Sequence, residues 1–147
     1  MPSLKRVTRT LAAMAALGLT IALAYPGAPA RAHGDVQPQP VDTTGLDALK
    51  DWLTEAPYTG NATAIKIGSS GYNQNCARCH GLDVISGGLA PDLRFLEKGK
   101  TGDEWFIQRI RHGATINGVT KMPAFEGILS QEAMWAIRAF IEAKHED

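Results

Sequence analysis

Cysteine is scarce in this sequence, which has two cysteines in 147 residues, Cys76 and Cys79. A disulfide between cysteines three positions apart would close too small a loop to stabilise the fold much. A zinc site usually needs two further cysteine or histidine ligands at similar spacing, and the sequence has neither a third cysteine nor a His-x3–5-His pair. The sequence therefore disfavours both a structural disulfide and a zinc site.

A long apolar run is also missing. The run from Leu11 to Ala24 has fourteen residues, whereas a membrane-spanning helix needs about 20. It follows three basic residues at positions 5, 6 and 9 and precedes Ala30-Arg31-Ala32, an A-x-A cleavage signature. These features predict a bacterial signal peptide over residues 1–32, with cleavage after Ala24 as the less favoured alternative to cleavage after Ala32. The predicted mature chain begins at His33, has no membrane span and lies in the periplasm.

The third absence is an excess of positive charge. The sequence has 15 basic and 15 acidic residues, and four of the basic ones lie within the predicted signal peptide. The mature chain then carries eleven basic against fifteen acidic residues, a net charge of −4 with neutral histidines. Nucleic-acid binding normally needs a basic face, so the sequence predicts no nucleic-acid partner.

The two cysteines belong to the run Cys76-Ala77-Arg78-Cys79-His80, a spacing that is typical of c-type haem attachment. On a helix, residues three and four positions apart share one face, so both thiols and the imidazole can reach one flat ligand. The thiols can add to the two haem vinyl groups, and His80 then becomes the proximal iron ligand. A thioredoxin-like redox motif would need a βαβ context, whereas the periodic segments here are helical. The motif therefore predicts one covalently bound haem c per chain.

The mature chain is expected to start with an extended arm, residues 33–60, that is rich in Pro, Gly and Asp. Within it, apolar residues at 46, 49, 52 and 53 predict a short amphipathic helix from Thr44 to Glu55. This helix either packs on the protein's own surface or helps to dock a partner, and its stripe of Leu and Trp favours packing.

Residues 61–147 are predicted to form an all-α domain. The first helix should run from about Thr63 into the haem motif, with small residues at 64, 68 and 71 that let another helix approach closely. Thr101 and Glu104 match a capping box and predict a helix from 101 to 113, which places Trp105 and its apolar neighbours inside. Ser130 is expected to cap a last helix that ends near 144. Asn73 and Asn75 are expected to be solvated or capping residues.

Met122 is the best candidate for the second axial ligand. It follows an Asn117-Gly118 turn in a region without helical period, so its thioether can reach the iron from the side opposite His80. Two of the other methionines lie in the predicted signal peptide, and Met134 lies inside the last helix, where it is expected to fill the core.

The motif, the three-helix region around it and the late Met-Pro together resemble the class I cytochromes c, over about Ala64 to His145. The resemblance implies a small fold of helices wrapped around one covalently bound haem. It implies that Gly68 and Tyr72 on the first helix cross Phe140 on the last. It also implies that the carbonyl of Pro91 accepts a hydrogen bond from the ring nitrogen of His80 and orients that ring.

Three longer runs are similar to the PedF-type cytochromes c-550 within this family: His33 to Val36, Tyr72 to Gly81 and Phe125 to Ile137. Members of that group accept electrons from pyrroloquinoline-quinone (PQQ) alcohol dehydrogenases in the periplasm. The resemblance thus implies such a dehydrogenase as electron donor, with a terminal oxidase or another cytochrome as acceptor.

An iron bound by both His80 and Met122 has no open position for a substrate, so we expect an electron carrier and no enzyme. The alternatives are a small haem peroxidase or a haem-based sensor, which need an open iron, and a carrier for a different periplasmic dehydrogenase. Basic residues near the haem-bearing segments either dock the partner or are merely solvated: Arg78, Lys98, Lys100 and Lys121.

Overall fold

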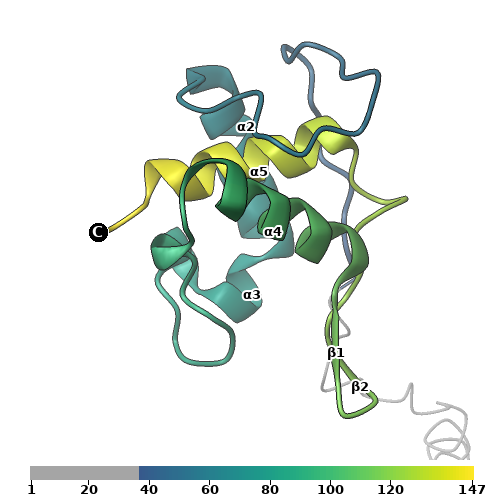
Figure 1. The fold of residues 1–147 in the computed structure, drawn as a ribbon, viewed down its shortest axis with the longest axis vertical. Coiled ribbons are helices and arrows are strands. Elements are labelled where there is room, and N and C mark those ends of the chain that lie inside the picture. Colours follow the sequence, from purple (N-terminus) through teal and green to yellow (C-terminus); the bar gives the residue numbers. More distant parts are fainter. Residues whose placement is uncertain (1–36) are drawn as a thin grey trace, which may run out of the picture. The chain divides into compact units, whose positions relative to one another are not determined.

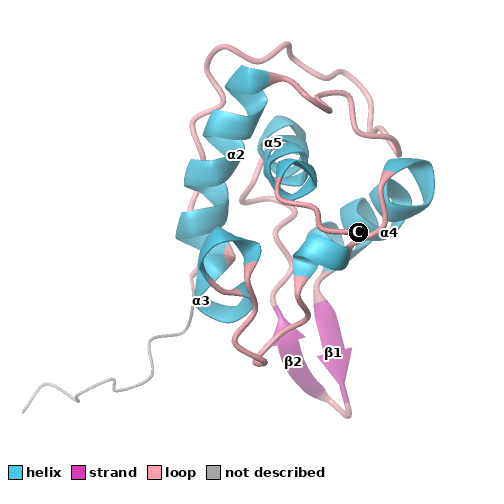
Figure 2. Cartoon of the chain, turned by 90° about the vertical axis from the view of Figure 1, so that its left-hand side faces the viewer, coloured by secondary structure: helices cyan, strands magenta, loops and turns pink. Residues whose placement is uncertain are grey.

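The computed structural model describes residues 37–147, so the predicted signal peptide and the first residues of the arm lie outside the described part. In chain order the elements are α2 (Ala62–Asn75), α3 (Ala77–His80), the 3-10 turns η1 (Leu82–Val84) and η2 (Leu93–Phe95), α4 (Gly99–His112), β1 (Ala114–Ile116), β2 (Val119–Met122) and α5 (Gln131–Ala143) (Figure 1). The predicted mostly helical fold is confirmed. The two short antiparallel strands form a hairpin that the sequence analysis did not predict (Figure 2).

Helices α2 and α5 cross at Gly68, in the centre of the fold. A Cβ atom on Gly68 would lie 1.9 Å from the carbonyl oxygen of Ala136, so only glycine allows this approach. Beside the crossing, the rings of Tyr72 and Phe140 pack with their centroids 5.4 Å apart. The predicted face of small residues and its aromatic pair are therefore present.

Helix α4 packs on the opposite side of α5 and carries the second half of the core. Phe106, Ile107 and Ile110 are buried, and the ring of Phe106 lies 6.2 Å from that of Trp135. A buried ion pair joins the two helices, with Nε of Arg138 donating to Asp103 over 2.7 Å. The terminal nitrogen Nη1 of Arg138 is also buried, and it has no hydrogen-bond partner among residues 37–147.

The prediction of a helix from Thr44 to Glu55 is wrong, because residues 44–55 contain only turns, bends and chain without regular structure. The leucines of this segment do pack against the core, but as part of a strap. Its backbone N–H groups donate to side chains of the helices: Leu49 to Glu132 over 2.8 Å, and Leu53 to Gln131 over 2.6 Å. A helix of about 12 residues is marginal by itself, so these contacts decide the conformation.

The predicted capping box at the start of α4 is also wrong. The helix begins at Gly99, two residues before Thr101, and Lys98 precedes it without a side-chain cap. The reason lies at Gly102, where a Cβ atom would lie 1.6 Å from the carbonyl oxygen of Glu97. The chain therefore folds back tightly on Glu97 there, and Thr101 is already inside the first turn. The predicted cap of α5 is confirmed, since the Ser130 hydroxyl accepts from the Ala133 N–H over 3.2 Å.

Among residues 37–147, no helix combines the length and the apolar composition that a membrane crossing requires.

Candidate haem-binding site

The haem motif lies at a bend between two helices. Helix α2 ends at Asn75, Cys76 has φ −119° and ψ −38°, and α3 follows directly. The Cys79 and His80 N–H groups both donate to the Cys76 carbonyl, over 3.1 and 2.9 Å. This single turn brings the two cysteines and the histidine to one side of the chain, as the spacing predicted. Both thiols are free, and burial raises the pKa of Cys76 to about 12, so this thiol is neutral.

Asn75, directly before the motif, is buried rather than solvated as predicted. Its side-chain oxygen accepts from the Gln39 N–H over 2.7 Å, and its amide nitrogen donates to the carbonyls of Gln39 and Gly71 over 3.2 and 3.1 Å. The side chain thus pairs with both the N–H and the carbonyl of Gln39, as the backbone of a neighbouring strand would. This contact attaches the arm to the chain one residue before Cys76.

The turn after His80 requires a glycine and continues in strained backbone. Gly81 has φ 82°, and a Cβ atom there would lie 1.7 Å from the Ile85 carbonyl oxygen. The Tyr72 hydroxyl donates to the Gly81 carbonyl over 2.9 Å, which connects α2 to the end of α3. Three residues after Gly81, the buried and β-branched Val84 has φ 70°, an outlier for this residue type. The chain is therefore forced into a tight loop beside His80.

His80 has a hydrogen bond that decides which of its two ring nitrogens donates. Its Nδ1 lies 2.9 Å from the carbonyl oxygen of Pro91, which can only accept. Nδ1 therefore carries the proton, and Nε2 keeps a lone pair that can bind a metal. The hydrogen bond that the family resemblance implied is thus present in the structure, while the role of His80 as an iron ligand stays a prediction.

Met122 is the last residue of β2, whereas the sequence predicted only a turn before it and a region without helical period. The turn at Asn117 and Gly118 is present, with φ values of 51° and 75°. The backbone of Met122 is held closely: a Cβ atom on Gly113, which ends α4, would lie 2.3 Å from the Met122 carbonyl oxygen. Its side chain is half-buried and contacts the core, while Met134 is completely buried in α5, in line with its predicted role as core filler.

The donor groups of this site fit a haem better than a bare metal ion. Among the described residues, no group of three or more His, Cys, Asp or Glu side chains could hold a metal ion. A thioether and an imidazole are ligands suited to haem iron. The segment between His80 and α4 also exposes large apolar side chains of the kind that a flat apolar ligand covers, namely Leu82, Ile85, Leu89 and Phe95. The residues present therefore fit a covalently bound haem.

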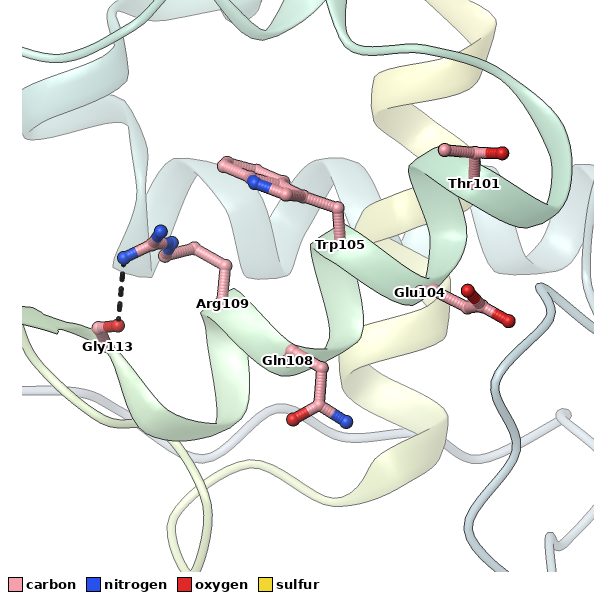
Figure 3. Close-up of a pocket in the computed structure, with 6 residues that line it drawn as sticks. All are labelled: Thr101, Glu104, Trp105, Gln108, Arg109 and Gly113. Carbon is pink, nitrogen blue, oxygen red and sulfur yellow. Dashed lines mark hydrogen bonds between the residues drawn. The ribbon is translucent and has the colours of Figure 1, made fainter.

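A cavity of about 510 Å³ follows one side of α4 (Figure 3). Trp105, predicted to be internal, lines it with 46% of its surface exposed, and the Arg109 guanidinium carbon lies 5.2 Å from the centre of the Trp105 ring. Arg109 also donates to the Gly113 carbonyl over 3.3 Å. Because Gly113 lies against Met122, the cavity places a cation and an aromatic ring near the methionine end of the site. This pair was not predicted from the sequence, although the spacing of four residues on a helix could have indicated it.

The four basic residues named from the sequence differ in their surroundings. Lys98 lies 3.7 Å from Asp147, and Lys100 lies 3.4 Å from Glu55. Arg78 and Lys121 are exposed, and neither forms an ion pair with another residue of the range 37–147. Of the four, Arg78 and Lys121 therefore have charges that are available to a partner.

Comparison with known proteins gives three main findings. A family model described as cytochrome C oxidase, cbb3-type, subunit III, matches residues 63–141. The chain is 53% identical over 123 residues to cytochrome c550 of Pseudomonas aeruginosa, and this match covers 80% of this chain and 85% of that protein. It is 33% identical over 88 residues to quinohemoprotein alcohol dehydrogenase ADH IIB of Pseudomonas putida, and this match covers 60% of this chain and 12% of that protein.

A second Pseudomonas putida protein, quinohemoprotein alcohol dehydrogenase ADH-IIG, is 32% identical over 92 residues, 62% of this chain and 12% of that protein. No solved structure gives a significant match. The family model covers more than half of the chain, and the cytochrome c550 match covers most of both proteins. With the haem motif, the hydrogen-bonded His80 and the helical fold, these matches show that the chain belongs to the cytochrome c family of haem-binding electron carriers.

Proposed function

We propose that this protein is a periplasmic one-electron carrier that accepts electrons from a PQQ-dependent alcohol dehydrogenase and passes them toward a terminal oxidase or another cytochrome. The observation that carries the proposal is the hydrogen bond from Nδ1 of His80 to the Pro91 carbonyl, 2.9 Å long. It leaves Nε2 as a metal ligand at the one position where two cysteines can also hold a haem.

In this proposal Cys76 and Cys79 hold one haem c through thioether bonds, and the absence of a third cysteine limits the chain to one. His80 and Met122 would be the protein's two ligands to the iron, and Pro91 would orient His80. When bound, the haem supplies a reversible one-electron change at its iron. The protein's own part would be to supply two ligands, which would keep substrates off the iron. Its apolar side chains near the site would disfavour the more highly charged ferric state.

The proposed donor is supported by the relatives whose names include quinohemoprotein alcohol dehydrogenase, because a stretch of each resembles this chain. In those proteins the matching stretch is a small part of a longer dehydrogenase. A separate carrier of the same family is suited to receive electrons from a dehydrogenase that lacks such a stretch. The proposed location follows from the predicted signal peptide over residues 1–32.

A small haem peroxidase is the alternative from another class, and a carrier for a different dehydrogenase is the alternative within the same class. A peroxidase needs a vacant or easily displaced sixth position. The backbone of Met122 pairs with Ala114 in the hairpin and lies against Gly113. This arrangement favours a permanent ligand. We therefore favour electron transfer over peroxidase chemistry.

The test is to purify the exported protein and mix it, oxidised, with a PQQ alcohol dehydrogenase and its alcohol. We expect a mass equal to the polypeptide from His33 plus one haem, and rapid reduction that depends on both enzyme and alcohol. A mass equal to the bare polypeptide would refute haem attachment. Slow reduction, together with rapid peroxide consumption, would favour the peroxidase alternative.

A further inference from the structure

The carbonyl that accepts the His80 hydrogen bond lies in a loop that is held on both sides. Pro91 is flanked by Ala90 and Asp92, and Ser86 bonds to both. The Ser86 hydroxyl donates to the Ala90 carbonyl, and the Ser86 N–H donates to Oδ2 of Asp92 over 3.2 Å. Ser86 therefore fixes the two residues that decide where the Pro91 carbonyl points.

The Asp92 carboxylate accepts hydrogen bonds at both oxygens. Oδ1 accepts from the backbone N–H and from Nε of Arg94, each over 3.1 Å. Oδ2 accepts from a terminal nitrogen of Arg94 over 2.9 Å, in addition to the Ser86 N–H. The hydrogen bonds from Arg94 hold the pKa of the Asp92 carboxyl far below its usual range. Asp92 is therefore charged at neutral pH and has four donors around it.

Arg94 in turn bonds to the end of the chain. Its other terminal nitrogen lies 2.7 Å from the Glu146 carboxylate, and the Glu146 N–H donates to the Arg94 carbonyl over 3.1 Å. Glu146 follows α5, so the loop that carries Pro91 is connected to the helix at the centre of the fold. A continuous set of polar contacts thus leads from Glu146 through Arg94 and Asp92 to the acceptor of the His80 proton.

We propose that Asp92 is a positioning residue for His80: it fixes the Pro91–Asp92 peptide group, holds the Pro91 carbonyl at Nδ1 and so tunes how strongly the imidazole binds the haem iron. This inference rests on the proposed function. The accepting oxygen belongs to the peptide bond that Asp92 itself forms, so a rotation of the Asp92 backbone moves it directly. An aligned acceptor makes the ring more basic at Nε2, which favours ferric iron and lowers the reduction potential.

The experiment compares Asp92→Ala and Asp92→Asn in the exported, haem-bearing protein. Alanine removes all four acceptor contacts, whereas asparagine keeps one side-chain oxygen for the Arg94 or Ser86 N–H. In Asp92→Ala, we expect solvent exchange of the His80 Nδ1 proton, followed by NMR in the ferrous protein, to be faster by about tenfold, as for the loss of about one net hydrogen bond. We also expect a higher reduction potential. Asp92→Asn should lie between wild type and Asp92→Ala in both measurements.

The matched control is Asp42→Ala. Asp42 also accepts from an N–H two residues later, that of Thr44, over 2.9 Å, and from the Thr44 hydroxyl over 2.7 Å. Its removal changes the net charge by the same amount in the arm, outside the loop that carries Pro91. The exchange of the His80 proton and the reduction potential should both stay at their wild-type values in this control.

Three outcomes would overturn the positioning role: unchanged proton exchange in Asp92→Ala, equal shifts in the alanine and asparagine variants, or the same shift in Asp42→Ala. If Asp92→Ala does not fold, Ser86→Ala removes the contact to Ala90 without a change of charge, and faster exchange is again expected. A wild-type protein without covalent haem would instead refute the proposed function. A haem protein with normal dehydrogenase reactivity and unchanged variants would refute the positioning role alone.

Discussion

At the crossing of α2 and α5, we expect Gly68→Ala to lower the stability of the fold. The added Cβ would lie 1.9 Å from the Ala136 carbonyl oxygen, and real contacts of this kind do not fall below 3.0 Å. The helices must therefore separate by at least 1.1 Å at this point. Because the obstacle is backbone, no side chain can turn away to make room.

The expected cost follows from two opposing terms. Overpacking of a well-packed core costs about 1–3 kcal/mol, and a contact with backbone belongs at the upper end, about 3 kcal/mol. Alanine gains about 1 kcal/mol over glycine from helix propensity. The net destabilisation is then about 2 kcal/mol, which for a domain of this size lowers the melting temperature by about 8 °C.

Gly71→Ala in the same helix is the control, since it has the same propensity gain. Its Cβ would lie 3.2 Å from side-chain carbons of Ile137 and Val41, which can move. Urea unfolding of the haem-bearing proteins, followed by far-UV circular dichroism, should show a large loss for Gly68→Ala and little change for Gly71→Ala. A Gly68→Ala protein as stable as wild type, or an equal loss in both variants, would refute the reasoning.

Three further predictions concern the iron ligand, the docking charge and the buried ion pair. Met122→Ala should let carbon monoxide bind the ferrous protein and should lower the potential, while Met134→Ala should do neither; the reverse pattern would make Met134 the ligand. Lys121→Glu should alter the rate of reduction by the dehydrogenase, and its ionic-strength dependence, with no change in the haem spectrum; a rate insensitive to both salt and substitution would point to an apolar contact. Asp103→Ala leaves Arg138 buried with less compensation and should cost about 3–5 kcal/mol in urea unfolding, so a loss below about 1 kcal/mol would argue against a dry site.

Local signals in the sequence predicted the features that depend on a few neighbouring residues. Ser130 caps α5 and Asn117-Gly118 forms a turn, because in each case the deciding contact lies within four residues. The Cys76 to His80 spacing likewise places three side chains on one turn whatever the rest of the chain does. The family resemblance supplied what spacing could not, such as the contact between His80 and Pro91 over eleven residues.

The errors at residues 44–55 and at Asn75 share one physical cause, which is that partners distant in the sequence satisfy the backbone groups better than local structure would. Residues 44–55 have a helical pattern, yet their N–H groups bond to Glu132 and Gln131, which lie about 80 positions later. Asn75 is a polar residue at the end of a helix, where solvation is expected, yet its side chain bonds to the backbone of Gln39. No local period contains this information, because it exists only when the arm lies against the helices.

Asp92 could not be assigned a role from the sequence for a similar physical reason. In the run Ala90-Pro91-Asp92-Leu93, an aspartate after proline is typical of a turn, and its side chain does accept from the N–H two residues later. What distinguishes it is that the adjacent carbonyl accepts the His80 proton and that Arg94 connects it to Glu146. Only through those two contacts can a turn residue affect how strongly His80 binds the iron, and both contacts join residues that are far apart in the sequence.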